Sequence, residues 1–450
     1  MRKLLLATAA TMGALLATTG GAKAQPVKPV APGTIVVHLN GYIQFEIADY
    51  GSSYNTVTVP AGVTGVTAGT YKLNPIATDG DVRLYAGFDA QTLSGIDYGA
   101  QVELRTVTSD AGVGANKVTG SGSTTGSDSL YVKRAYGYLG TPETGFGRAG
   151  QTDGAFELLQ SGVIEAFGDG AQFNTDGGET SLLPTDASPA NFIYADTSNL
   201  YATDKIVYIS PAFFGLNAAV SYEPNSNGIK EGFGNNAFAS DTSSALASSP
   251  NASDIGKRRR NTVDGMVQYM LKSDGVVYKA SAGILYGAPI AFSGVPTALG
   301  TTTHFGFDDL EVYQIGGQVT FAGLTVGANV KGGQVEDGYA FKPKGARDSL
   351  AYIVGADYVI GPYVLGASYW NGQSAGGFVP GNTSHMARTL SEYGAAAGGN
   401  YVISPNLSLF AQYVYGRKHQ PGNTFGVAGS KNTKGNAQVQ ALATGFTLKW

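Results

Sequence analysis

The sequence contains no cysteine among its 450 residues, so disulfide bonds and thiolate metal sites are excluded. Charged residues are also scarce, at 14%, yet the mean hydropathy is close to zero at −0.04. Beyond the first residues, no apolar run approaches the roughly eighteen residues that a membrane-spanning helix needs. The net charge of −4 is mildly acidic and gives no reason to expect a nucleic-acid partner.

The first residues are typical of an export signal. Arg2 and Lys3 precede an apolar run that ends near Ala17, and Ala22-Lys23-Ala24 forms an A-x-A cleavage motif. We therefore expect residues 1–24 to be a secretory signal peptide, whose removal changes the net charge from −4 to −7. Residues 25–33, which include three prolines, are expected to form an extended periplasmic linker.

Glycine (65 residues) and tyrosine (26 residues) are abundant, and apolar residues alternate with small or polar residues along most of the chain. A period of two is the signature of β-strands. We predict sixteen strands, at residues 34–49, 80–91, 96–107, 130–140, 146–154, 203–210, 216–223, 261–272, 276–287, 309–321, 324–334, 350–360, 363–372, 389–404, 407–417 and 436–450.

The connections between these strands alternate strictly between short and long. Every short connection contains residues that favour turns, whereas the long ones are rich in Gly, Ser and Asn. All long loops therefore lie at one end of an antiparallel sheet. A membrane barrel explains this arrangement, because backbone groups in hydrocarbon must all be paired within a closed sheet. We predict that residues 34–450 form an all-β, sixteen-stranded antiparallel transmembrane β-barrel, and barrels of that size enclose an aqueous pore.

The last strand explains how the barrel would close. Phe446, Leu448 and Trp450 share one face of this strand, while the opposite face is small or polar. We expect the strand to pair with the first one and to serve as the barrel closure and assembly signal.

The segment RAYGYLGTPETGFGRAGQTDGAF, residues 134–156, and the C-terminal aromatic residue after alternating apolar residues resemble general porins of Gram-negative outer membranes, in the alphaproteobacterial style. Trp450 replaces the phenylalanine with which that family usually ends. The barrel-assembly machinery is still expected to recognise it.

The resemblance implies a homotrimer in the outer membrane, with short periplasmic turns and long extracellular loops. It also implies that the third long loop, residues 155–202, folds inward as a constriction. The function implied is passive diffusion of small hydrophilic solutes and ions, without a cofactor.

The predicted constriction loop carries seven acidic residues and no Lys or Arg. We expect Glu157, Glu165 and Asp169 to form the acidic side of the constriction, and the resemblance favours Glu165 and Asp169. Strand parity places basic residues on the facing wall, namely Arg83, Arg105, Arg134 and, with an ambiguous register, Lys205. Opposed charges across a narrow passage would select solutes by charge and size. The alternative is that these acids belong to a solvated external loop.

Other readings remain open at this point. The basic run Lys257, Arg258, Arg259 and Arg260 could bind lipopolysaccharide phosphates or simply be solvated. A solute-selective channel for sugars or an anion, hinted at by Trp370 at a lumenal position, and a surface adhesin or receptor are the alternative functions. An enzyme is not expected, because the four histidines are scattered and no hydrolase, zinc-protease or P-loop motif is present.

Joint neutralisation of Glu165 and Asp169 is predicted to shift the reversal potential in a salt gradient toward anions. Fixed charges in a narrow passage weight the permeation of ions, because salt screens them poorly there. A planar-bilayer recording measures the shift. An unchanged reversal potential in a variant that still inserts would show that the loop acids lie outside the constriction.

Overall fold

The structure is a computed structural model. It describes residues 31–53, 56–59, 67–72, 74–106, 130–173, 203–225, 259–289, 308–335, 339, 341–342, 344–375, 389–421 and 435–450. The expected signal peptide, residues 1–24, and most of the expected linker lie outside the described residues.

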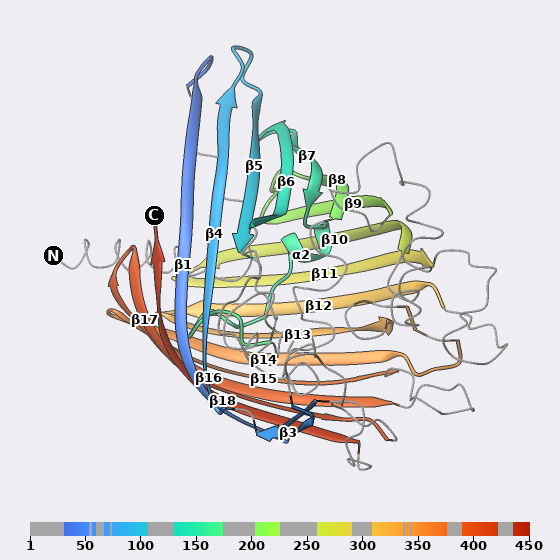
Figure 1. Cartoon of the computed structure of the whole chain (residues 1–450). Coiled ribbons are helices and arrows are strands. Elements are labelled where there is room, and N and C mark those ends of the chain that lie inside the picture. The colour runs from blue at the N-terminus through green and yellow to red at the C-terminus, as the bar shows by residue number, and fades with distance from the viewer. Residues whose placement is uncertain are drawn as a thin grey trace.

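Sixteen strands form one closed antiparallel barrel, as the alternating sequence predicts (Figure 1). Each strand pairs with its neighbours in the chain, and the first strand also pairs with the last. The strands are β1 (Ile35–Ser52), β4 (Ile76–Gln91), β5 (Asp97–Thr106), β6 (Leu130–Thr141), β7 (Gly145–Thr152), β8 (Thr203–Ile209), β9 (Leu216–Asn225), β10 (Arg259–Ser273), β11 (Val276–Pro289), β12 (Leu310–Phe321), β13 (Leu324–Gln334), β14 (Ser349–Ile360), β15 (Tyr363–Ser374), β16 (Leu390–Ser404), β17 (Leu407–His419) and β18 (Asn436–Lys449).

The barrel closes where β18 meets β1. Phe446 lies opposite Phe45 in this ladder, and their rings are 6.0 Å apart. At the end of the chain, the Gly41 amide donates to the Trp450 carbonyl at 3.2 Å, and the Trp450 amide donates to the Gly41 carbonyl at 3.1 Å. A Cβ atom on Gly41 would lie 2.1 Å from the Trp450 ring, so the ring packs directly on the glycine. The terminal tryptophan therefore helps to seal the sheet.

The two faces of the sheet are inverted relative to a soluble barrel. On β14, Leu350, Val354 and Ile360 are exposed on the outer surface, whereas Asp357 is buried on the inner one. On β13, the inner face carries the buried Lys331. Polar and charged groups thus line the interior, as expected for a barrel surrounded by hydrocarbon.

The short connections are tight turns whose backbone favours glycine. In the two-residue hairpin loop between β10 and β11, Asp274 and Gly275 have φ angles of 49° and 80°. Positive φ at both central positions is the type I′ pattern, which matches the right-handed twist of the flanking strands. Ala322 and Gly323 repeat this pattern between β12 and β13.

Two predicted segments, one loop and one strand, have wrong boundaries. The predicted loop 50–79 is shorter, because β1 continues to Ser52 and β4 begins at Ile76, and a small hairpin, β2 (Thr56–Val59) and β3 (Gly69–Lys72), lies between them. The backbone ladder continues where the apolar alternation has ended, since hydrogen bonding does not require an apolar face. The predicted strand 146–154 ends at Thr152, where the chain turns into the helix α2 (Ala155–Leu158).

The helix α2 spans only four residues. None of the described helices combines the length and the apolar character that a membrane crossing requires.

Replacing Gly41 with alanine is predicted to weaken barrel closure, because the new methyl group meets the Trp450 ring and overpacking costs about 1–3 kcal/mol. Replacing Trp450 with aspartate should impair assembly more strongly than it alters the conductance of the channels that do insert. Heat-modifiable migration on a gel reports the folded fraction. Gly51→Ala, in the same strand pair, is the matched control and should fold as the wild type does, because its Cβ would make only an ordinary van der Waals contact with Gln440 at 3.5 Å.

Candidate functional site

The segment that follows β7 folds into the barrel and is fastened to the inner wall along its length (Figure 1). Asp264 on β10 accepts the Ala155 amide at 3.1 Å, and Asn329 on β13 donates to the Ser161 carbonyl at 2.8 Å. On the last strands, Asn400 donates to the Gly168 carbonyl at 2.6 Å and Gln412 accepts the Asp169 amide at 3.0 Å. The inward loop, residues 155–173, thus follows the wall from β10 to β17 and narrows the lumen.

A row of glycines on the inner wall leaves room for this loop to pack against the sheet. These are Gly316, Gly327, Gly355 and Gly366 on four successive strands, β12 to β15. A Cβ atom on Gly316 would lie 2.0 Å from the Ser161 carbonyl oxygen, and one on Gly366 would lie 2.2 Å from the Phe167 ring. We call these four residues the glycine track. The loop can approach the wall only because the track has no side chains.

An apolar cluster fills the space between the inward loop and the wall. Phe156, Phe167 and Phe173 from the loop pack with wall residues that include Trp370. Trp370 is fully buried, and its ring meets the Phe173 ring edge-on at 5.9 Å. It lies behind the loop and does not line the open passage. The lone tryptophan therefore gives no support to a sugar-selective channel.

A second connection also contributes to this cluster. Between β13 and β14, Tyr339 and Phe341 are buried with the loop phenylalanines. The neighbouring Lys342 holds this connection in place, because its ammonium group lies 2.6 Å from Asp308 and 3.2 Å from Asp348. Lys331 on β13 links the two connections: its ammonium group donates to the Tyr339 hydroxyl at 3.3 Å and lies over the Phe156 ring. Sequence alternation gave no signal for this second inward segment.

The three predicted loop acids lie in different surroundings. Glu157 and Asp169 are half-buried, as are Val163 and Ala166 on the loop between them. Glu165 is buried and turns toward the wall, where its carboxylate accepts the Phe173 amide at 3.1 Å. Burial raises the pKa of Glu165 to about 8. At neutral pH this side chain is therefore mostly uncharged and lies away from the passage.

Asp169 is held at the far end of the loop. Its carboxylate accepts the Ala171 amide at 2.8 Å and the Gln172 side-chain amide at 3.2 Å. These bonds orient the carboxylate. Asp169 lies close enough to β1 for its charge to act on the Tyr42 hydroxyl. The loop acid therefore comes near the basic wall at this point.

The predicted basic residues all face the interior, and each is paired within the wall. Arg83 bonds Asp81 at 2.5 Å, and Arg105 and Arg134 share Glu103. Arg134 also bonds Asp153 at 2.9 Å, and Lys205 bonds Glu223 at 3.1 Å. A buried cation without a counter-charge is costly, so these carboxylates stabilise the cations in place. Asp81 and Glu103 lie two residues from Arg83 and Arg105 on the same strands. Arg134 and Lys205 are paired with carboxylates from other elements, which the sequence pattern could not reveal.

Arg148 on β7 is the exception among these wall cations. It is 7% exposed, its guanidinium group lies 4.6 Å from the centre of the Tyr136 ring, and it donates to the Thr152 hydroxyl at 3.4 Å. No carboxylate of the described residues lies within 4 Å of it. Arg148 and Phe146 lie on the same face of the strand by alternation, so the sequence did not show which face points inward. For that reason the sequence alone does not identify Arg148 as a wall residue. Arg148 thus adds a positive charge that the wall does not neutralise.

Other predicted positions are placed as follows. Lys257 and Arg258 fall outside the described residues, and Arg259 and Arg260 open strand β10, where Arg260 pairs in register with Asn225 and Ala288. On β18, Leu448 is exposed on the outer face and Phe446 is half-buried. Within the described ranges, no group of three or more His, Asp or Glu side chains is arranged to hold a metal ion.

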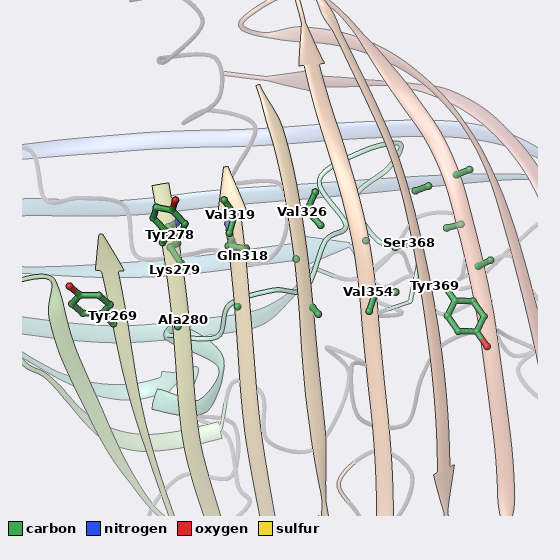
Figure 2. A pocket seen from close by; sticks show the side chains of 18 of the residues that line it. Tyr269, Tyr278, Lys279, Ala280, Gln318, Val319, Val326, Val354, Ser368 and Tyr369 are labelled. Carbon is green, nitrogen blue, oxygen red and sulfur yellow. The ribbon is translucent and has the colours of Figure 1, made fainter. Parts of the chain in front are cut away.

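A hollow of about 980 Å³ lies on the opposite side of the same wall and does not belong to the passage. Figure 2 shows its lining of small and β-branched side chains, with Tyr269 and Tyr278 at one side and Tyr369 at the other. The hollow's exposed residues, such as Val326 and Val354, belong to the outer face of the barrel. It is therefore a feature of the surface that faces hydrocarbon.

A protein-family model described as Gram-negative porin matches residues 7–420 of the chain. Among solved structures, the chain is similar to an anion-selective porin from Comamonas acidovorans, with a TM-score of 0.53 and 13% identity over 93% of this chain and 100% of that one. This likeness shows a shared fold. No protein of curated function matches the chain.

Two further structures are similar at lower scores. A loop-deletion mutant of OmpT, an outer membrane protein of Vibrio cholerae, aligns with a TM-score of 0.49 and 11% identity over 92% of this chain and 99% of that one. A mutant of the Rh. blastica porin aligns with a TM-score of 0.47 and 13% identity over 92% and 100%.

Replacing Gly316 with alanine is predicted to push the inward loop off the glycine track. The added methyl group would meet a backbone carbonyl that cannot yield, and such overpacking costs about 1–3 kcal/mol. The displaced loop can move only into the lumen, so single-channel conductance should fall. Gly317→Ala is the control on the other face of β12, where the nearest atom is 3.6 Å away. Equal conductance in the two variants would contradict the docking.

Proposed function

Since the chain belongs to the family of Gram-negative porins and forms an outer-membrane channel, we propose that its lumen selects small hydrophilic solutes and ions by charge as well as by size. The inward loop supports selection by size, because it occupies one side of the lumen and leaves a narrower passage beside it. Charge selection is supported by the distribution of charged groups around that passage.

The single observation that carries this proposal is the contrast between Arg148 and the other wall cations. Arg83, Arg105, Arg134 and Lys205 each have a carboxylate partner within the wall, and Arg148 has none among the described residues. An ion pair contributes a local dipole, whereas an unpaired guanidinium group contributes a net charge. Arg148 therefore dominates the positive potential of its side of the passage.

The loop supplies the opposite sign at two separated points. Glu157 and Asp169 are half-buried toward the two ends of the described loop, and the only acid between them is the buried Glu165. The field across the passage then runs from the β7 wall toward the loop ends. Such a transverse field orients dipolar solutes and weights the passage of ions, and it acts strongly because a narrow passage is poorly screened.

A solute-selective channel is the second candidate, and one observation favours it. Two tyrosine rings on the inner wall lie under arginine side chains: Arg83 is 5.0 Å from the Tyr42 ring, and Arg148 is 4.6 Å from the Tyr136 ring. Aromatic faces next to cations suit solutes that combine an apolar face with a negative group. Conductance block by such a solute at low concentration would favour this candidate.

Further parts of the assignment are proposals that rest on family membership and on sequence. Family membership assigns a channel rather than an enzyme. We propose a homotrimer, removal of residues 1–24 on export, and recognition of the Trp450 end by the barrel-assembly machinery. Outer-membrane lipid is the proposed surrounding of the apolar outer face, and lipopolysaccharide phosphates the proposed partner of residues 257–260.

Single substitutions are predicted to separate the three kinds of charged residue. Arg148→Gln should shift the reversal potential in a salt gradient toward cations, and Asp169→Asn should shift it toward anions, each by several millivolts or more because each removes one unit of charge beside the passage. Glu165→Gln should leave it unchanged at pH 7, since that carboxyl group is mostly protonated.

Planar-bilayer recordings of the three variants test this scheme. Arg148→Lys is the matched control for Arg148→Gln, because it keeps the positive charge at the same position and should leave the reversal potential close to the wild-type value. An Arg148→Gln channel with the wild-type reversal potential would count against the proposed selection.

A further inference from the structure

Glu165 closes a turn in the inward loop and holds it in a defined shape. Its carboxylate accepts the Phe173 amide at 3.1 Å, across eight residues of chain. Phe173 is fully buried, and its ring lies edge-on to Trp370 on β15 at 5.9 Å. The hydrogen bond therefore ties the loop's turn to an aromatic contact with the barrel wall.

The residues on either side of Glu165 press directly on the glycine track. A Cβ atom on Gly355 would lie 2.9 Å from the Ile164 side chain, and one on Gly366 would lie 2.2 Å from Phe167. Both side chains are buried. Glu165 lies between these two anchors, so its carboxyl group is enclosed when the loop is docked and can reach water only when the loop leaves the wall.

Few charges are available to balance an ionised Glu165. The charges that act on it are those of Asp169 and Glu157 on the same loop, which oppose ionisation, and of Lys331 on β13, which favours it. The other titratable groups on the elements packed around it are Asp357 on the inner face of β14 and Tyr339 in the second inward connection. On β15 no titratable side chain faces inward among the described residues. The surroundings thus favour the uncharged acid.

We infer that Glu165 is a proton-controlled latch: protonated, it holds the inward loop against the barrel wall, and ionised, it loosens the loop into the lumen. The released segment can move only toward the passage, because the wall bounds it on the other side. Loosening therefore interrupts conduction. This inference goes beyond charge selection, since Glu165 does not face the passage.

The direction of the pH dependence follows from the two states of the loop. Burial raises the pKa of Glu165 to about 8 in the docked loop, from an ordinary value of 4.5 in water. Below pH 4.5 both states are protonated and docking is strongest. Between pH 4.5 and 8 only the undocked state releases its proton, so the docked population relative to the undocked one falls by up to about tenfold per pH unit. Above pH 8 no further change is expected.

Single-channel recording of the full-length, membrane-inserted protein between pH 5 and 9 tests the latch. In the wild type, closing events should become more frequent as pH rises to about 8 and should then level off. Glu165→Gln mimics the protonated acid and should conduct with few closing events at every pH. Glu157→Gln, on the same loop, is the control: its closing events should still become more frequent as pH rises, and they should level off at a lower pH because a charge that opposes ionisation of Glu165 is gone.

Exchange of the Phe173 amide hydrogen gives a second readout that does not require conduction. After correction for intrinsic exchange rates, its protection should fall with pH in the wild type and stay constant in Glu165→Gln. Wild-type closing that is independent of pH would overturn the latch, and so would a Glu165→Gln channel that keeps the wild-type pH profile. Neither result would affect the reversal-potential shifts by which charge selection is judged.

Discussion

The whole structure depends on the requirement that backbone hydrogen bonds be satisfied without help from water. In hydrocarbon, a sheet with a free edge would leave a row of unpaired amides and carbonyls, each costing several kcal/mol, so the sheet must close on itself. The pairing of β18 with β1 meets this requirement. It also explains why Trp450 packs on Gly41: the ring completes the outer surface at the seam, where the last residue still takes part in the ladder. Closure fixes a hollow cylinder, and its interior must then be shaped by other means.

The interior is shaped by a loop that behaves as part of the wall. The glycine track lowers the inner surface over four strands, and the inward loop fills that depression with its own backbone and apolar side chains. Side chains of wall residues then bond the loop backbone at several points, so the loop's polar groups are not left unpaired in a packed region. One half of the cylinder thus becomes a packed core, and the passage is displaced toward β1 and β4 to β9.

The net charge along this passage depends more on which charged side chains are paired with each other than on how many charged residues the passage contains. Most wall arginines are paired with carboxylates on the same or a neighbouring element of the wall, and one loop acid is removed from the passage by burial. Arg148 has no carboxylate partner among the described residues of the wall, and Glu157 and Asp169 are the half-buried acids of the loop. A charged residue in a pore therefore contributes to selection only if its partners leave its charge uncompensated. Burial keeps Glu165 mostly uncharged, so it contributes little to the charge of the passage. For the same reason, its ionisation would weaken the docking of the loop on the wall.

The sequence by itself determined the barrel, because the period-two alternation, the strict order of short and long connections and the apolar last strand are local properties that admit one closed antiparallel solution. It also identified which faces point inward on regular strands such as β13 and β14. Tertiary structure alone decided the constriction. Glu165 is oriented by the barrel wall around β15, eight strands further along the chain. Arg134 is paired with Glu103 and Asp153, which other elements of the wall supply. Gly316 is needed because a loop carbonyl more than 150 residues earlier in the chain packs against it. Contacts between residues so far apart in sequence leave no periodic signal, so only the folded barrel shows which charges meet.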